Sequence, residues 1–224
     1  MIYFTKLWIV TLKQLPTKPL GGLQGIVTIK KSIEPGSEAY QDNGIPFIRV
    51  SDVSKFDISE TKLFLSCNIV SEVDSLFPKK DTILFSKDGS VGIAYKVNKD
   101  MPIITSGALL HLNVKDTKIV LPDYLTLVLN SPIVQLQAER DANGAIIQHW
   151  KPSEIDKVVI PILDMSIQNE ISRKVQHSFS LRLRSKELLE YAKQAVEMAI
   201  EQGEDAAVTW LKDKVNNFEN RKEI

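Results

Sequence analysis

Hydrophobic and polar positions follow two different patterns along the 224-residue chain. Up to about residue 163, apolar runs of four to six residues alternate with turns rich in Gly, Asp, Ser and Pro, which is the pattern of short β-strands. After Pro161 the apolar residues recur at helical spacing, and residues 167–202 contain neither Gly nor Pro. The pattern predicts a mixed α/β globule over residues 1–163 and a helical region over residues 164–224.

Five short runs in the first region are predicted to be strands, and one longer segment is predicted to be helical. The helical segment extends from Pro122 to Gln137, and Pro132 is expected to break it because proline cannot continue a helix. The five residues after Phe85 are expected to form the polar tip of a hairpin. The expected strands are Ile26–Ile29, Pro46–Val50, Thr82–Phe85, Val91–Tyr95 and Ala108–Leu112.

The helical region is predicted to contain one long helix and one short helix. A helix of about 36 residues would be about 54 Å long at 1.5 Å per residue, which is longer than a small domain is wide. Gly203 is placed to end it, and a second helix is expected from Glu204 to about Asn217.

The apolar stripe of the long helix needs another helix to cover it. We favour a coiled coil with a second chain, while a hairpin in which the short helix folds back on the long one stays open. The residues expected to pair are Ile171, Val175, Leu181, Leu188, Ala192 and Val196.

Composition and charge restrict the possible classes of function but do not identify one. The 28 basic and 28 acidic residues balance to a net charge of zero, so binding to nucleic acid has to depend on a local patch. The single cysteine, Cys67, is expected to be an inert thiol in a reducing compartment. The apolar opening run contains Lys6 and is too short to span a bilayer, so a cytoplasmic protein is expected.

Motifs for catalysis or metal binding are not found in the sequence. The three histidines, His111, His149 and His177, do not have the spacing of metal ligands. The stretch Lys87–Ser90 lacks the two glycines of a phosphate-binding loop, and the acidic residues are too scattered for the Mg²⁺ site of a nuclease. A non-enzymatic protein without a metal or cofactor is expected.

Four polar loops between the predicted strands contain residue types that suit DNA. Arg and Lys can contact phosphates or guanine, Gln and Asn can pair with adenine, and a Gly–Ser backbone can approach phosphate closely. Each loop alone is also explained as an ordinary turn, so composition does not decide the question. The loops are Arg49–Asp52, Ser86–Ser90, Thr105–Gly107 and Asn143–Lys151.

The order of these segments resembles the specificity subunits of type I restriction–modification systems. GIPFIRVSDV, residues 44–53, is similar to their G-I-P-F/W-I-R-x-x-D-I/V segment, and ILFSKDGSVG, residues 83–92, is similar to the next landmark. NGAIIQH, residues 143–149, matches the loop before a P-x-x-I…I-P-x-P segment, where Leu163 replaces the second proline. QNEI, residues 168–171, is similar to the start of the family's spacer helix, and the resemblance runs from about Leu20 to Glu204.

The resemblance implies a non-catalytic protein that reads half of a bipartite DNA target. The implied fold is α+β, with a target recognition domain built on a short, strongly bent sheet, a long coiled-coil spacer helix and a short terminal helix. The chain has room for one domain and one spacer, so a half-subunit is expected, as a homodimer or paired with a second half. The implied partners are double-stranded DNA, the methyltransferase subunit, which uses S-adenosylmethionine, and the ATP-driven restriction subunit. Neither S-adenosylmethionine nor ATP is expected to bind this chain.

On this interpretation the polar loops face DNA. Lys87 and Ser90 are expected at the hairpin tip, with Lys87 on a phosphate or a base edge and Asp88 shaping the turn. The other expected contacts are Arg49, Ser51, Ser106, Gln148, His149 and Lys151. Two alternatives stay open: a protein-interaction adaptor that dimerises through its helix, and a methyltransferase or nuclease fragment, against which the missing motifs argue.

Overall fold

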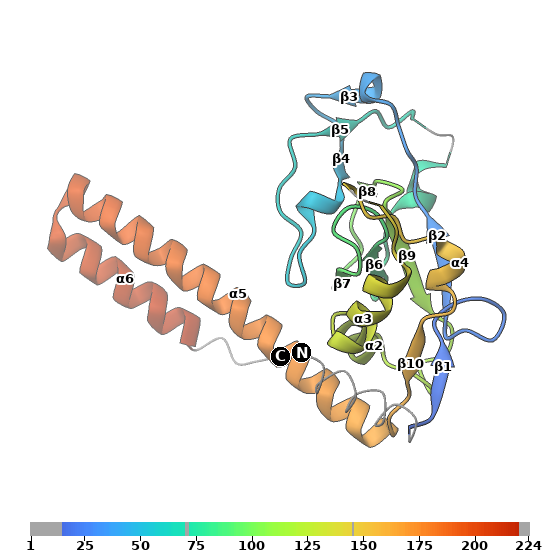
Figure 1. The fold of residues 1–224 in the computed structure, drawn as a ribbon. Helices are drawn as coiled ribbons and strands as arrows, with labels where there is room; N and C mark the ends of the chain where they lie inside the picture. The colour runs from blue at the N-terminus through green and yellow to red at the C-terminus, as the bar shows by residue number, and fades with distance from the viewer. Residues whose placement is uncertain (1–14, 70–71, 145, 220–224) are drawn as a thin grey trace. The chain divides into compact units, whose positions relative to one another are not determined.

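The computed structural model describes residues 15–69, 72–144 and 146–219, and the chain divides into two compact units, Met1–Ser172 and Arg173–Ile224 (Figure 1). The first unit contains three small sheets and short helices, and the second is helical. The predicted α+β fold class, with a long C-terminal helix followed by a short one, is confirmed. The apolar opening run with Lys6 lies outside the described residues. Among the helices that are described, none is long and apolar enough to cross a membrane.

A four-stranded antiparallel sheet forms the centre of the first unit. Its order is β2 (Val27–Lys31), β9 (Leu109–Val114), β6 (Ile83–Ser86) and β7 (Ala94–Lys96). Strands β6 and β7 form the predicted hairpin, with Phe85 opposite Ala94. Helices α2 (Pro122–Leu129) and α3 (Pro132–Asp141) each begin with a proline, so Pro132 separates two helices as predicted.

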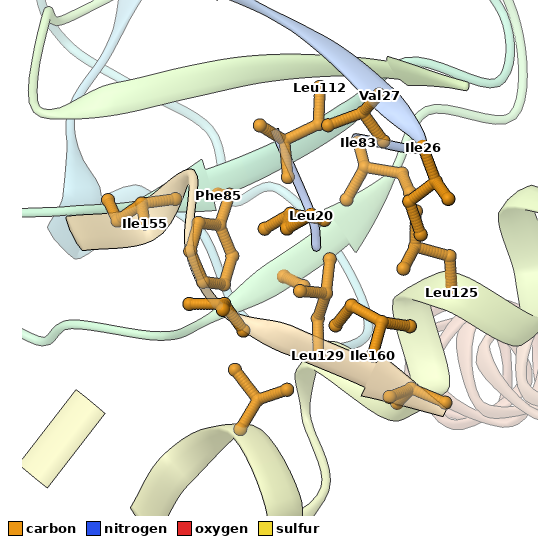
Figure 2. Close-up of a cluster of buried hydrophobic side chains, with 14 of the residues drawn as sticks. Leu20, Ile26, Val27, Ile83, Phe85, Leu112, Leu125, Leu129, Ile155 and Ile160 are labelled. Carbon is orange, nitrogen blue, oxygen red and sulfur yellow. The ribbon is translucent and has the colours of Figure 1, made fainter. Parts of the chain in front are cut away.

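The main core is formed where this sheet meets α2, α3 and two segments near the ends of the unit. Strand β1 (Thr17–Pro19) pairs with β10 (Val159–Pro161), which follows the short helix α4 (Pro152–Ile155). Figure 2 shows Leu20, Phe85, Leu129 and Ile160 pointing into one apolar cluster from separate segments. Each fully buried side chain of this size contributes about 1.5–3 kcal/mol to folding.

A second sheet lies beside the first and has a smaller core of its own. Its order is β3 (Tyr40–Gln41), β5 (Phe64–Leu65), β4 (Ile45–Ile48) and β8 (Ile104–Thr105), and its last two strands are parallel. The core of this sheet contains Phe47, Leu65, Leu76 and Ile104. Three single turns of 3-10 helix, Ser37–Ala39, Val50–Asp52 and Val73–Leu76, belong to the connections around it.

A buried hydrogen bond joins the two sheets. The hydroxyl of Thr105 in β8 lies 2.8 Å from Nε2 of His111 in β9. Burial, assisted by the positive charge of Lys30, lowers the pKa of His111 to about 4. The imidazole is therefore neutral at neutral pH and can share this hydrogen bond without a buried charge.

The first two turns of α5 (Met165–Gln202) are part of the first unit. Gln168 is fully buried; its Oε1 accepts from the Leu121 N–H at 2.9 Å, and its Nε2 donates to the carbonyls of Ile119 and Leu163 at 3.0 and 2.8 Å. Ile171 packs against the main core. Ile171 was predicted to pair with a partner helix, but its partly buried side chain already packs against the globule, so less of it is left for a partner.

A buried ionic network holds the same two turns. The Ser172 hydroxyl donates to Oδ2 of Asp123 at 2.7 Å, and Lys96 Nζ lies 3.0 Å from Oδ1 of Asp123. Lys96 also lies 3.1 Å from Asp81. Burial alone would lower the pKa of Lys96, but the hydrogen bonds and charges of Asp123 and Asp81 raise it above its ordinary value, so the ammonium stays charged.

In the second unit, α6 (Glu204–Glu219) runs back along α5 (Figure 1). Gly203 turns the chain with a φ of 95°. The rings of Tyr191 and Trp210 meet edge to face, with centroids 6.1 Å apart. The hairpin is therefore the arrangement found, rather than a long helix covered only by a second chain.

The hairpin leaves part of the apolar stripe uncovered. Ala195 and Ala207 are buried, but several larger side chains of α5 are 39–80% exposed. These exposed side chains are Leu181, Leu183, Leu188, Leu189, Val196 and Ile200. Of the other residues predicted to pair, Ala192 is exposed and Val175 is partly buried.

Candidate nucleic-acid interface

Main-chain hydrogen bonds connect the four polar loops in a row. The Ser106 N–H donates to the carbonyl of Ile48, next to Arg49, at 2.8 Å, and the Lys87 N–H donates to the carbonyl of Ala108 at 2.9 Å. The carbonyl of Lys87 then accepts from the Trp150 N–H at 2.8 Å. We call this row the loop edge; it consists of residues 49–52, 86–92, 105–108, 143–144 and 146–151.

The hairpin tip of the loop edge is organised by Ser86. Its buried hydroxyl donates to the Ser90 carbonyl at 2.5 Å and accepts from the Ile93 N–H at 2.9 Å. Gly89 and Gly92 have φ values of 70° and 82°, which favour glycine. The turn is consequently longer than predicted, and β7 begins at residue 94 rather than 91.

Asp88 links the hairpin tip to the loop before α4. One carboxylate oxygen pairs with Lys87 Nζ, and the other lies 2.8 Å from Nδ1 of His149. The Lys87 side chain is only 16% exposed, whereas that of His149 is 65% exposed. The lysine that was expected to face phosphate is thus paired and mostly covered, and Asp88 does more than shape its turn.

The loop before α4 is a closed turn next to the buried Trp150. Asn143 and His149 exchange two main-chain hydrogen bonds of 3.0 and 2.7 Å, and the Gly89 N–H donates to the carbonyl of Gln148 at 2.9 Å. Trp150 is 1% exposed, and its ring lies 5.8 Å from that of Phe85 in the main core. The side chains of Gln148, His149 and Lys151 are exposed on this fixed backbone.

The segment after β4 is held by Asp52. The Asp52 carboxylate accepts from the Arg49 N–H at 2.8 Å and from the Ser51 hydroxyl at 3.2 Å. The guanidinium of Arg49 lies 3.7 Å away from it, and the Arg49 side chain is 52% exposed. Ser106, by contrast, is 7% exposed, so its hydroxyl lies in the interior and is poorly placed for the DNA contact that was predicted.

The exposed side chains of the loop edge are suited to a polyanion with hydrogen-bonding bases. Two cationic side chains and several neutral donors point outward, while Asp52 and Asp88 are engaged with neighbouring groups. Over the described parts of the chain, no three His, Cys, Asp or Glu side chains are grouped to hold a metal ion. The outward residues are Arg49, Ser51, Ser90, Gln148, His149 and Lys151.

The supporting roles of Ser86 and Asp88 are not visible in the sequence. Ser86 follows an apolar strand like many turn residues, and Asp88 precedes a glycine as in many turns. Ser86 meets its partners Ser90 and Ile93 when the hairpin closes. Asp88 meets His149 only when the hairpin and the loop before α4 come together.

The sequence model of the family described as type I restriction modification DNA specificity domain matches residues 17–190. The chain belongs to this family. The resemblance found in the ordered motifs is confirmed, and all of the loop edge lies inside the matched range. Because specificity subunits of these systems are non-catalytic DNA-recognition proteins, the prediction of a non-enzymatic protein is confirmed with it.

Solved structures show the same fold. The S subunit of a type I restriction–modification system from M. genitalium is 17% identical, with a TM-score of 0.56, over 83% of this chain and 44% of that one. The HsdS subunit from Thermoanaerobacter tengcongensis is 16% identical, with a TM-score of 0.52, over 82% of this chain and 46% of that one.

A third structure comes from work on complex assembly and conformational transition of the type I R-M system. It is 16% identical, with a TM-score of 0.54, over 91% of this chain and 50% of that one. The chain thus spans about half the length of the solved structures it matches. No curated relative matches the sequence.

Proposed function

We propose that this chain reads one half of a bipartite DNA target for a type I restriction–modification system. The observation that supports this function best is the loop edge, where main-chain hydrogen bonds connect the polar loops and three of them, residues 49–52, 86–92 and 146–151, carry exposed donors. Membership of the specificity-domain family supports the same conclusion. The chain would act in the cytoplasm, without a cofactor of its own, beside a methyltransferase subunit and a restriction subunit.

Different residues of the loop edge would contact phosphates and base edges. Arg49 and Lys151 are long, exposed cations that can contact phosphate and hold the protein in register. Gln148 and His149 lie on the fixed loop before α4 and can present hydrogen-bonding groups to base edges. Lys87 and Asp88 would support this surface rather than read bases, because they pair with each other.

The helical unit would pair two readers on one duplex. Leu189, Val196 and Ile200 follow one another by seven and four residues, so they lie on the same side of α5. Their 57–80% exposure leaves an apolar stripe that α6 does not cover. A second copy, or a second half-subunit with the same stripe, would bury it in a coiled-coil contact.

The test is DNA binding by the chain in complex with its methyltransferase subunit. The target is first mapped as the set of genomic positions that become methylated when both proteins are produced together. Duplexes with and without that target are then titrated at several salt concentrations, and specific affinity should fall as salt rises. Equal affinity for both duplexes would support the adaptor alternative and reject the recognition function.

A double variant connects the result to the loop edge. Arg49→Ala with Lys151→Ala should weaken binding to all duplexes and reduce the slope of log affinity against log salt by about two, one for each phosphate contact. Lys79→Ala with Lys99→Ala removes two exposed lysines outside the loop edge and is the matched control. An equal loss in the control pair would show that overall charge, not the loop edge, binds DNA.

A further inference from the structure

Two exposed isoleucines, Ile146 and Ile147, lie in the turn that Asn143 and His149 close. Ile146 is 98% exposed and Ile147 is 57% exposed. A single exposed apolar side chain is ordinary on a protein surface, but these two are adjacent and belong to the surface that is proposed to meet DNA. They lie on the loop edge among polar side chains, so the apolar surface is narrow.

Main-chain hydrogen bonds fix the two ends of the turn that carries these side chains. The reciprocal hydrogen bonds between Asn143 and His149 close it, and Gly89 ties it to the hairpin tip. Gly144 has a φ of 130°, and a Cβ there would lie 2.0 Å from the Ile147 carbonyl oxygen, so the chain is folded tightly at this point. Isoleucine is itself stiff about χ1. Little conformational entropy would therefore be lost if a ligand surrounded the two residues.

We propose that Ile146 is an apolar wedge that inserts between two base pairs of the DNA held at the loop edge, with Ile147 packed against the adjoining sugar or base edge. This inference rests on the proposed function. Apolar side chains that enter a base step unstack it and kink the duplex, and the extra contacts made by the bent DNA offset the cost. The exposed Lys151 lies near the wedge in sequence and would hold a flanking phosphate.

Duplex DNA fits this tip better than a protein partner. A stable protein interface buries roughly 1,200–2,000 Å² around a broad apolar centre. The tip offers only two apolar side chains, and the neighbouring Asn143, Gln148 and His149 are polar and exposed. A gap opened between two base pairs is narrow and apolar, with phosphates on either side, and this is the shape and chemistry that the tip matches.

The experiment uses the complex of the full chain with its methyltransferase subunit and the duplex mapped by methylation. Each base of the half-site is replaced in turn by 2-aminopurine, whose fluorescence rises when it is unstacked. The variants are Ile146→Ala, Ile146→Leu and the control Leu23→Ala. Leu23 is 99% exposed but lies outside the loop edge, so its replacement removes an equally exposed apolar group.

The wild-type complex should give a fluorescence rise at one base step besides the base that the methyltransferase takes out of the stack. Ile146→Ala should abolish that rise and weaken binding tenfold to a hundredfold, whereas Ile146→Leu and Leu23→Ala should preserve both. The rise at the methylated base should persist in every variant, which shows that the complex is still assembled and active.

Three results would overturn the wedge. One is an unchanged fluorescence rise in Ile146→Ala while the complex still prefers its target, and this leaves the proposed function intact. Another is loss of the methyltransferase from the purified Ile146→Ala complex with unchanged DNA stacking, which would assign the tip to a protein contact. The third is a wild-type complex with no preference for the mapped target, which rejects the wedge and the proposed function together.

Discussion

Nδ1 of His149 lies 2.8 Å from the carboxylate of Asp88, a residue 61 positions earlier in the chain. The same carboxylate pairs with Lys87, so one acidic side chain connects the hairpin tip with the loop before α4. Two main-chain hydrogen bonds run alongside this contact. The hairpin tip and the loop before α4 are therefore one structural element.

The substitution Asp88→Asn should loosen this element. The amide side chain would keep the shape of the turn but lose the charge that holds Lys87 and orients His149. We expect affinity for the mapped target to fall about tenfold, with faster hydrogen exchange in residues 146–149, because the loop before α4 would keep only its main-chain ties. Asp100→Asn, which removes an exposed ion pair with Lys79, is the control and should change neither measurement.

Gln148→Ala tests whether the loop before α4 reads a base. A residue that pairs with a base edge should cost about 1–3 kcal/mol in target affinity and relax the preference at one position of the half-site. Selection of bound duplexes from a pool randomised at each position measures both effects. Ser153→Ala, at an exposed serine in the first turn of α4, is the control. Unaltered preference at every position would remove Gln148 from the reading residues.

The buried His111 should make stability depend on pH. Its folded-state pKa of about 4 lies below the ordinary 6.5, so the unfolded chain binds the proton more readily than the folded protein. Stability is complete above pH 6.5 and is lost as the pH falls toward 4, by about 3 kcal/mol over this window at 1.36 kcal/mol per unit. Urea unfolding at a series of pH values measures this loss of unfolding free energy.

The matched variants are His111→Gln and His177→Gln. The first removes the buried imidazole and should flatten the decline in unfolding free energy between pH 6.5 and 4. The second removes an exposed imidazole on α5 and should leave the decline in place. A His111→Gln protein whose stability still falls as steeply as wild type would show that other groups cause the acid sensitivity.

Asp123→Asn tests the ionic network that holds the start of α5. The substitution leaves Lys96 buried with one carboxylate instead of two and weakens the bond from Ser172. We expect a loss of about 3 kcal/mol in the free energy of unfolding of the first unit. Asp81→Asn is the control, because Asp81 is half-exposed and asparagine tolerates its φ of 68°. The Asp81→Asn variant should lose about 1 kcal/mol or less of unfolding free energy.

Leu189→Asp combined with Val196→Asp tests the uncovered stripe of α5. Two charges there would oppose a coiled-coil contact, so the species in light scattering should change from a dimer to a monomer. Far-ultraviolet circular dichroism should stay unchanged, since α6 covers a different side of the helix. Gln194→Asp places a charge on an exposed polar position nearby, away from the stripe, and is the control. A double variant that remains dimeric would assign the contact to another surface.

Regular elements with strong local patterns could be predicted from the sequence. The break at Pro132, the end of the long helix at Gly203 and the β6–β7 hairpin follow from the residues themselves. Strands β3, β5 and β8 were missed because each has only two residues and exists through its partners. A pattern of period two needs more positions than that to be recognised.

The candidate site was predictable in its segments but not in its details. The four loops were identified because turn residues and base-reading residues coincide in them. The burial of Ser106 and the pairing of Lys87 depend on contacts between distant segments, which no local pattern records. The same holds for Ile171, whose spacing fits a helix stripe although its side chain belongs to the globule.

The bonds that join the loops of the loop edge run mostly from peptide group to peptide group. Such bonds place few demands on the identity of the outward side chains, so residues 90 and 148 can be exchanged while the scaffold stays the same, and exchange of residues 49 and 51 loses only their side-chain contacts with Asp52. A lineage could acquire a new target by a few substitutions at these positions, without inventing a new fold. Directed evolution of this protein toward chosen sequences should accordingly start from libraries at those four codons.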